Sequence, residues 1–220
     1  MTTTVLPRAA ASRPGRHRGI LLAVAIAVFA WFLLIVSLGA VGAFSGPPGK
    51  PPLPIAIAFA APVALFLAWM RLSRSFREFV SSLDLRLVVG MQAWRFAGLG
   101  FFFLYAHKVI PAVLAVPAGL GDMAVAVTAP WMVLALLHNP GLATGRAFVR
   151  WNLLGILDFV VAMGIGALGA MFATGRTGEI STAPMVMLPQ LLIPAFLVPF
   201  FFILHIVALL QGRELARTRA

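Results

Sequence analysis

The sequence predicts an all-α membrane protein, a bundle of six transmembrane helices with one interfacial amphipathic helix. The first observation is composition: of 220 residues, 61% are hydrophobic and only 10% are charged, whereas soluble domains are about half apolar and a quarter charged. The second is a mean hydropathy of +1.01, which implies more apolar surface than a soluble domain of this size buries. The third is the lack of cysteine, which excludes disulfide frameworks and thiolate metal sites.

Six apolar segments have the length that a membrane span requires, about 20 residues for a hydrocarbon core of about 30 Å. They cover residues 19–44, 53–70, 87–106, 117–138, 148–173 and 189–211. The first is too long for a signal-peptide core of roughly 7–15 residues, so we expect it to be an uncleaved span. A single transmembrane domain then covers residues 19–211, between basic tails at 1–18 and 212–220.

The positive charges predict the orientation of these spans. With a cytoplasmic N-terminus, the cytoplasmic tails and loops hold Arg8, Arg13, Arg16, Arg18, Arg71, Arg74, Arg77, Arg86, Arg146, Arg150, Arg213, Arg217 and Arg219. The outer loops hold only Lys50, Lys108 and Arg176. Because cytoplasmic loops are enriched in Lys and Arg, we expect both termini in the cytoplasm and the chain in the inner (plasma) membrane. The net charge of +11 then reflects orientation rather than nucleic-acid binding.

The loop between the second and third spans predicts the interfacial helix. Its apolar residues recur at helical spacing, at Leu72, Phe76, Phe79, Val80 and Leu83. Such a pattern is typical of an amphipathic helix that lies on a leaflet surface. The helix is either a connector that shields the bundle or a lateral gate or docking face.

Prolines interrupt two other segments. In residues 110–121, Pro111 and Pro117 predict either a short half-helix that dips back into the membrane or a plain hairpin before the fourth span. In the sixth span, prolines stand at 189, 194 and 199. They predict either a bent helix that packs around its neighbours, or freed carbonyls and a hinge.

Polar side chains within the spans are the candidate functional residues, because charge at bilayer depth is costly. They are Gln92, Arg95, Asp122, Asn152, Asp158 and His205. At 1.5 Å per residue, Arg95, Asp158 and His205 each lie about 12–13 Å from the nearest arginine of the basic end. These three ionisable groups, on three helices, are therefore expected at one level.

The natural pairing at that level is Arg95 with Asp158, with His205 as a third member. One interpretation is a structural ion pair that fixes helix packing. The other is a cavity for a small anionic or lipid-soluble ligand, with Arg95 as an anion anchor and the other two handling protons. Asp122 is expected to stand apart, as a capping acid at a helix N-terminus. The alternative for Asp122 is a gate near the outer surface, paired with His107 or Lys108.

Three functions fit this pattern. The first is a membrane protein that transports or binds a small molecule or ion, and it predicts a water-accessible cavity at Arg95. The second is a membrane enzyme for a lipid-soluble substrate, with His205 or Asp158 as acid or base and a lateral opening at that depth. The third is a structural or accessory subunit, with a dry ion pair and a small-residue face for a homo-oligomer or membrane partner. Apart from the bilayer, no cofactor, metal or nucleic acid is implied.

An inverted repeat of three plus three spans is a further possibility. At an offset of 98 residues, Gln92 meets Gln190, His107 meets His205, and Phe102–Phe103 meet another pair of phenylalanines. Transporters often combine such halves in opposite orientation. The alternative is coincidence among helices rich in Phe, Leu and Ala.

Four short motifs carry a resemblance to known proteins. They are Gln-Ala-Trp-Arg at 92–95, Pro-Ala-Gly-Leu-Gly-Asp at 117–122, Trp-Asn with a later Asp at 151, 152 and 158, and Leu-Ile-Pro-Ala-Phe-Leu-Val-Pro at 192–199. Over about residues 85–210 the chain resembles a group of small bacterial integral membrane proteins. That group has no assigned activity, so the resemblance implies no site and no substrate.

Overall fold

The computed structural model describes residues 14–219, and in these residues it is helical and contains no strand. Six helical segments are long and apolar enough to cross a membrane, which confirms the predicted fold class. The spans are formed by α1 (Pro14–Ala40), α2 (Leu53–Leu72), α4 with η1 and α5 (Leu85–Gly90, Met91–Gly98, Leu99–Ala106), α6 (Ala112–His138), α7 (Arg146–Phe172), and η4 with α8 (Ile193–Leu197, Val198–Arg219). Shorter helices are α3 (Arg74–Ser82), η2 (Pro140–Thr144) and η3 (Ala183–Val186).

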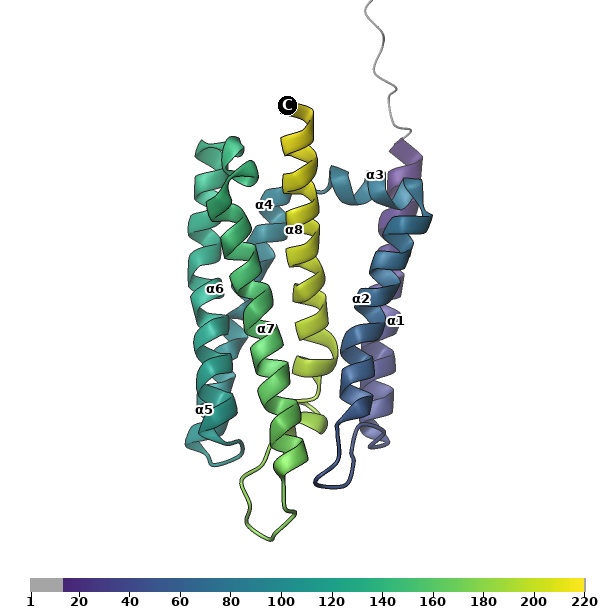
Figure 1. Cartoon of the computed structure of the whole chain (residues 1–220). Coiled ribbons are helices and arrows are strands. Elements are labelled where there is room, and N and C mark those ends of the chain that lie inside the picture. The colour runs from purple at the N-terminus through teal and green to yellow at the C-terminus, as the bar shows by residue number, and fades with distance from the viewer. Residues whose placement is uncertain (1–13, 220) are drawn as a thin grey trace, which may run out of the picture.

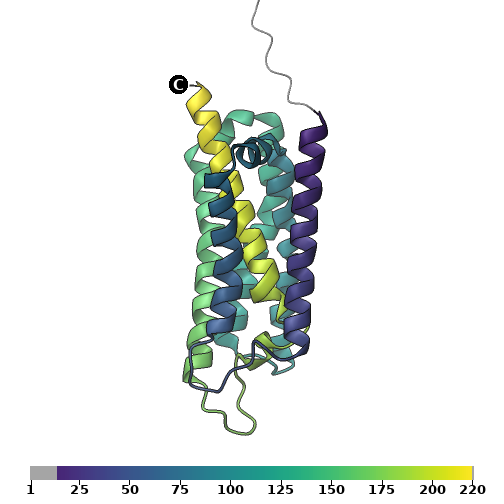
Figure 2. The ribbon, with the colours of Figure 1, turned by 90° about the vertical axis from the view of Figure 1, so that its right-hand side faces the viewer.

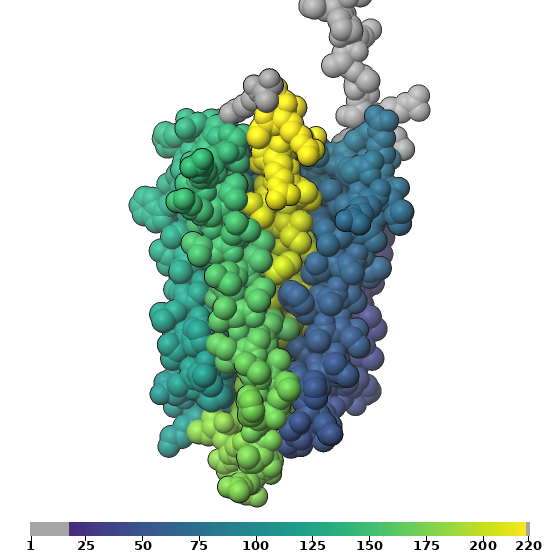
Figure 3. Space-filling view, in the orientation of Figure 1, coloured from purple at the N-terminus to yellow at the C-terminus, as the bar shows by residue number. Residues whose placement is uncertain are grey.

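The spans form two groups joined by α8. Helices α5, α6 and α7 lie on one side, α1 and α2 lie on the other, and α8 runs between them (Figure 1). The view turned by 90° shows α1 and α2 flanking α8 (Figure 2). In the space-filling view, α8 lies between α7 and α2 (Figure 3). Helix α1 begins at the same end of the bundle at which α8 ends.

Helix α3 lies across the bundle, and it is the amphipathic helix that the sequence predicts (Figure 1). It begins after Ser73, whose hydroxyl accepts a hydrogen bond from the backbone N–H of Phe76 at 3.2 Å, an N-cap. Phe76, Phe79 and Val80 are buried beneath it. Leu72, which the pattern assigned to the same face, is exposed because it belongs to the last turn of α2.

The half-helix predicted within residues 110–121 is wrong, and the plain hairpin holds. Helix α6 runs without a break from Ala112 to His138, so the fourth span begins five residues before the expected position 117. Pro111 occupies the N-cap of α6, where a missing N–H costs nothing. Ile110 and Leu114 at this end are buried against Phe101 and Met185, so the start of α6 is anchored by packing.

The helical ends also extend into the predicted tails. Helix α1 begins at Pro14, and α8 continues to Arg219. The extension of α8 follows from its terminal Arg, Glu, Leu and Ala residues, which are good helix formers. The rest of the N-terminal tail, residues 1–13, lies outside the described residues. The sixth span begins at Ile193 rather than 189, with a π-helical segment, η4, that contains Pro194.

Candidate intramembrane polar site

The third span presents its polar residues as a single stripe because its middle is a 3₁₀ helix. Residues Gln92, Arg95 and Gly98 of η1 are all buried. In a 3₁₀ helix, residues three apart lie directly above one another, whereas over six residues an α-helix would rotate the stripe by about 120°. The unusual helix therefore directs Gln92, Arg95 and Gly98 to the interior together.

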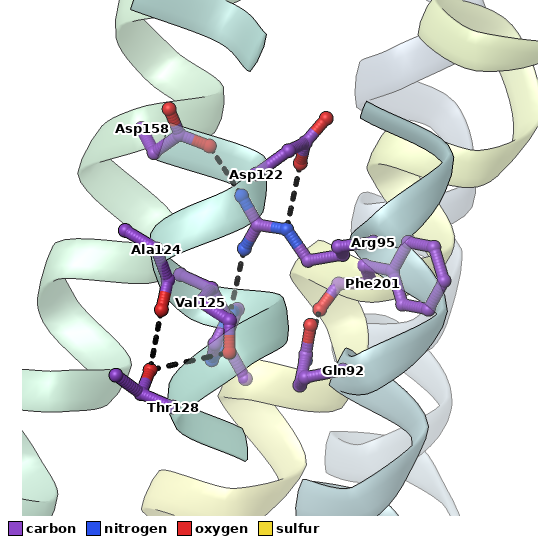
Figure 4. A network of polar contacts seen from close by, with 9 residues as sticks. Gln92, Arg95, Asp122, Ala124, Val125, Thr128, Asp158 and Phe201 are labelled. Atoms are coloured by element: carbon purple, nitrogen blue, oxygen red, sulfur yellow. Dashed lines mark hydrogen bonds and ion pairs between the residues drawn. The ribbon is translucent and has the colours of Figure 1, made fainter. Parts of the chain in front are cut away.

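Arg95 is the centre of the site. Its Nε donates to Asp122 of α6 at 2.7 Å, and one terminal nitrogen donates to Asp158 of α7. Its Nη1 lies 3.3 Å from Nε2 of His205 on α8, and its Cζ lies 3.9 Å from the ring centroid of Phe159. Figure 4 shows the guanidinium held between the two carboxylates. All three guanidinium nitrogens and one face of the cation thus have partners from other helices.

His205 takes a defined tautomer in this arrangement. Asn152 donates through its Nδ2 to the carbonyl of Phe148 at 2.9 Å, so its Oδ1 is the acceptor for Nδ1 of His205, 2.9 Å away. Nδ1 therefore carries the proton, and Nε2 is free to accept from Arg95. His205 and Asn152 are both fully buried, so the imidazole acts as a rigid acceptor for the guanidinium.

Glycines make room for these polar side chains. A Cβ atom placed at Gly121 would overlap the carboxylate of Asp158, and one placed at Gly155 would overlap the imidazole of His205. Helices α6, α7 and α8 can therefore approach one another closely at the level of the site.

Gln92 is the member of the stripe that is incompletely bonded. Its Nε2 donates to the carbonyl of Phe201 at 3.2 Å. Its Oε1 is buried and accepts no hydrogen bond from any residue between 14 and 219. A buried acceptor without a donor is costly, and this one lies one turn from Arg95.

A small cavity of about 30 Å³ adjoins the charged group, between η1 and the start of α8. Its lining includes Trp94, Arg95, Ala97, Asp122, Phe159 and Phe201. This volume is comparable to the share of one molecule in liquid water. The side chain of Arg95 is 1% exposed, whereas those of Asp122 and Asp158 are 15% and 14% exposed. The carboxylates are therefore the accessible part of the site.

The structure brings all six sequence-predicted residues into this region, but it corrects the expectation for Asp122. Asp122 lies in the third turn of α6, not at its N-terminus, and its partner is Arg95 rather than His107 or Lys108. Its carboxylate fits there because Gly98 leaves space opposite it. Sequence reasoning missed Phe159, although it directly follows Asp158.

The site has two carboxylates for one guanidinium. Among residues 14–219 no group of three or more His, Cys, Asp or Glu side chains is placed to hold a metal ion. With His205 as a neutral acceptor, the ionised group carries one negative charge in excess. That imbalance is the main chemical property of the site.

Comparison with known proteins gives one family. The model of a domain of unknown function (DUF8737) matches residues 52–211. The chain belongs to this family. The DUF8737 match includes α2 through most of α8, and so every residue of the polar site, but not α1. Neither the curated proteins nor the solved structures contain a match to the chain.

Proposed function

We propose that this multi-pass membrane protein binds a proton or small cation at the Arg95–Asp122–Asp158 site and transports it. The observation that carries the proposal is the charge imbalance of two carboxylates against one guanidinium in a buried site. An uncompensated charge in a low-dielectric interior costs several kcal/mol. A proton or a cation on one carboxylate removes that cost.

The same imbalance weighs against the anion that Arg95 alone would attract. Arg95 already donates to both carboxylates and to His205, which uses three of its five N–H groups. An incoming anion would be repelled by the two adjacent carboxylates. The cavity beside Arg95 has room for about one water molecule, and in volume it suits a proton carrier or a small cation.

A structural ion-pair lock is the second candidate. Its supporting observation is the completeness of the contacts around Arg95, which is 2% exposed as a residue. The enzymatic alternative has less support, since the described side chains that line the cavity carry no hydroxyl or thiol. We also propose that the end holding Arg71, Arg146 and Arg213 faces the cytoplasm of an inner membrane, on the positive-inside rule.

Infrared spectroscopy of the protein in lipid nanodiscs tests proton binding directly. The chain has only three aspartates, so Asp84→Asn, outside the site, is the matched control. We expect a protonated-carboxyl C=O band in the wild type and in Asp84→Asn, lost in Asp122→Asn or Asp158→Asn. A sodium-dependent shift of the carboxylate bands, absent in choline, would identify a metal cation instead. If neither signal appears, the proposal is wrong.

Flux measurements separate transport from a structural lock. Protein reconstituted into liposomes with an internal pH dye should collapse an imposed pH gradient faster than protein with Asp122→Asn. If a carboxyl group titrates but the protein does not carry protons across the membrane, the structural ion pair is the better explanation.

A further inference from the structure

The outward face of η1 carries a shallow groove of about 540 Å³. It is lined by the small residues Gly90, Ala93 and Ala97 and by the aromatic residues Trp94 and Phe96. Trp94 and Phe96 are exposed. Because η1 belongs to a span, this groove faces acyl chains rather than water. An apolar chain is the matching occupant.

The groove borders the small cavity at the polar site. Trp94 and Ala97 line both the groove and the small cavity that contains Arg95 and Asp122. A molecule lying along η1 would therefore place one end near the Asp122 carboxylate while the rest stays among apolar side chains.

We propose that the site binds a membrane amphiphile with a single primary ammonium head, its apolar tail in the groove of η1 and its head at Asp122. The inference rests on the proposed cation-binding function and adds the substrate class and its route. The ligand reaches the site sideways from the bilayer, past Trp94 and Ala97.

Charge and size both select this head group. The excess negative charge at Arg95, Asp122 and Asp158 is complementary to one ammonium, and the three N–H donors suit carboxylate oxygens. Phe201 also contributes an aromatic ring to the cavity lining, and aromatic rings attract cations. A primary ammonium is close in size to water and matches a cavity of about 30 Å³, whereas a trimethylammonium head does not.

Two irregular helices contribute to the lining of the cavity. They are the 3₁₀ helix η1 and the π-helical segment η4, which contributes Ile193 and Leu197. Such segments have weaker hydrogen bonding than an α-helix and recur at functional sites. They allow the cavity between η1 and η4 to widen around a head group without the unfolding of a regular helix.

Native mass spectrometry of the full chain in nonionic detergent, with n-dodecylamine as the probe, tests the proposal. Dodecyltrimethylammonium has the same charge and tail with a larger head, and dodecanol has the tail without the charge. We expect one dodecylammonium per chain and no discrete adduct with the other two. Asp122→Asn removes the charge and Ala97→Phe fills the rim, so each should weaken binding at least about tenfold. Ala60→Phe, at an exposed alanine of α2, is the matched control and should bind normally.

Several results would overturn the proposal. Equal binding of dodecyltrimethylammonium would show partition without head-group selection, and undiminished binding in Ala97→Phe would exclude the groove. The infrared band of the wild type separates this failure from that of the proposed function. If the band responds to pH but dodecylammonium neither binds selectively nor displaces the proton, only the further inference fails. If the carboxyl groups bind neither proton nor cation, both fail.

Discussion

Ion pairs of the same chemistry stand in two very different environments in this protein. On α3, Arg74 and Glu78 pair at 2.9 Å with side chains that are 86% and 54% exposed. In the bundle, Arg95 pairs with Asp122 and Asp158 while its own side chain is 1% exposed. Water and salt screen the first pair and leave it nearly neutral in energy. The buried ion pairs of Arg95 are not screened in this way, so their separation would be costly. They therefore fix the positions of the four helices that carry Arg95, Asp122, Asp158 and His205.

The largest expected effect comes from removing the buried cation. Arg95→Leu leaves two carboxylates without a partner, and we expect a loss of about 3–5 kcal/mol in the free energy of unfolding. Titration with a denaturing detergent measures it. Arg74→Leu, on the exposed pair, is the matched control and should change stability by less than about 0.5 kcal/mol.

The triple variant Arg95→Leu, Asp122→Asn, Asp158→Asn sharpens the comparison. If the cost of Arg95→Leu arises from stranded charge, the two amides should restore more than half of the lost stability. A triple variant no more stable than Arg95→Leu would show that packing of the guanidinium, including its contact with Phe159, carries the effect.

The sequence was sufficient to predict the six spans and the pairing of Arg95 with Asp158, because span length and the cost of buried charge are local properties. It was not sufficient for Asp122. That residue follows Pro-Ala-Gly-Leu-Gly, which favours a helix start, but packing of Ile110 and Leu114 begins α6 earlier. Nor does composition reveal that 91–98 is a 3₁₀ helix, which sets the direction of Arg95.

The inverted repeat stays a prediction. The offset of 98 residues aligns the 3₁₀ stretch 91–98 with 189–196, which overlaps the π-helical segment η4. The paired histidines, however, have different surroundings: His205 is buried in the site, whereas the Nδ1 of the exposed His107 contacts the carbonyl of Phe103. The two aligned histidines therefore share no polar contact that would support the repeat.

The next largest loss of stability is expected where a glycine leaves space for a side chain of the buried site. Gly155→Ala places a methyl group against His205, which should force α7 and α8 apart and cost about 1–3 kcal/mol. Gly164→Ala, on the same helix with open space beside it, should be neutral or slightly stabilising. Thermal unfolding in detergent compares the two. Equal losses would show that helix α7 tolerates neither substitution for reasons unrelated to His205.

Two buried glutamines extend the comparison to uncharged polar groups. Gln211 on α8 donates to the carbonyls of Val80 and Leu83 at 2.7 and 3.0 Å and ties α3 to the bundle. Gln211→Leu should cost about 1–2 kcal/mol, because two carbonyls lose a donor. Gln92→Leu removes the acceptor that has no donor, but it also removes the bond from Nε2 to the carbonyl of Phe201. These two effects oppose each other, so stability should change by less than about 0.5 kcal/mol. Chemical denaturation of both variants compares their free energies of unfolding. The comparison shows whether a buried glutamine stabilises the fold through its hydrogen bonds or only through its burial.

A smaller, pH-dependent effect is expected at Asp84, the N-cap of α4. Hydrogen bonds from the side chain and backbone of Arg86 lower the pKa of Asp84. The ionised carboxylate therefore stabilises the fold above the usual Asp pKa of about 3.9, and this stability is lost as the pH falls through the lower folded pKa. Because the pair is exposed, the loss should stay below about 1 kcal/mol. Stability measured from about pH 6 to pH 3 should fall less in Asp84→Asn.

The smallest effect is expected at Arg74 and Glu78 themselves. Arg74 is the first residue of α3, where a cation opposes the helix dipole, and a basic residue four positions before an acidic one is the weaker order of such a pair. The double-mutant cycle of Arg74→Ala and Glu78→Ala should give a coupling of less than about 0.3 kcal/mol that vanishes in high salt. A coupling above about 1 kcal/mol would mean that the surface of α3 is shielded from water as effectively as the site around Arg95. The contrast between the two kinds of ion pair would then not depend on burial.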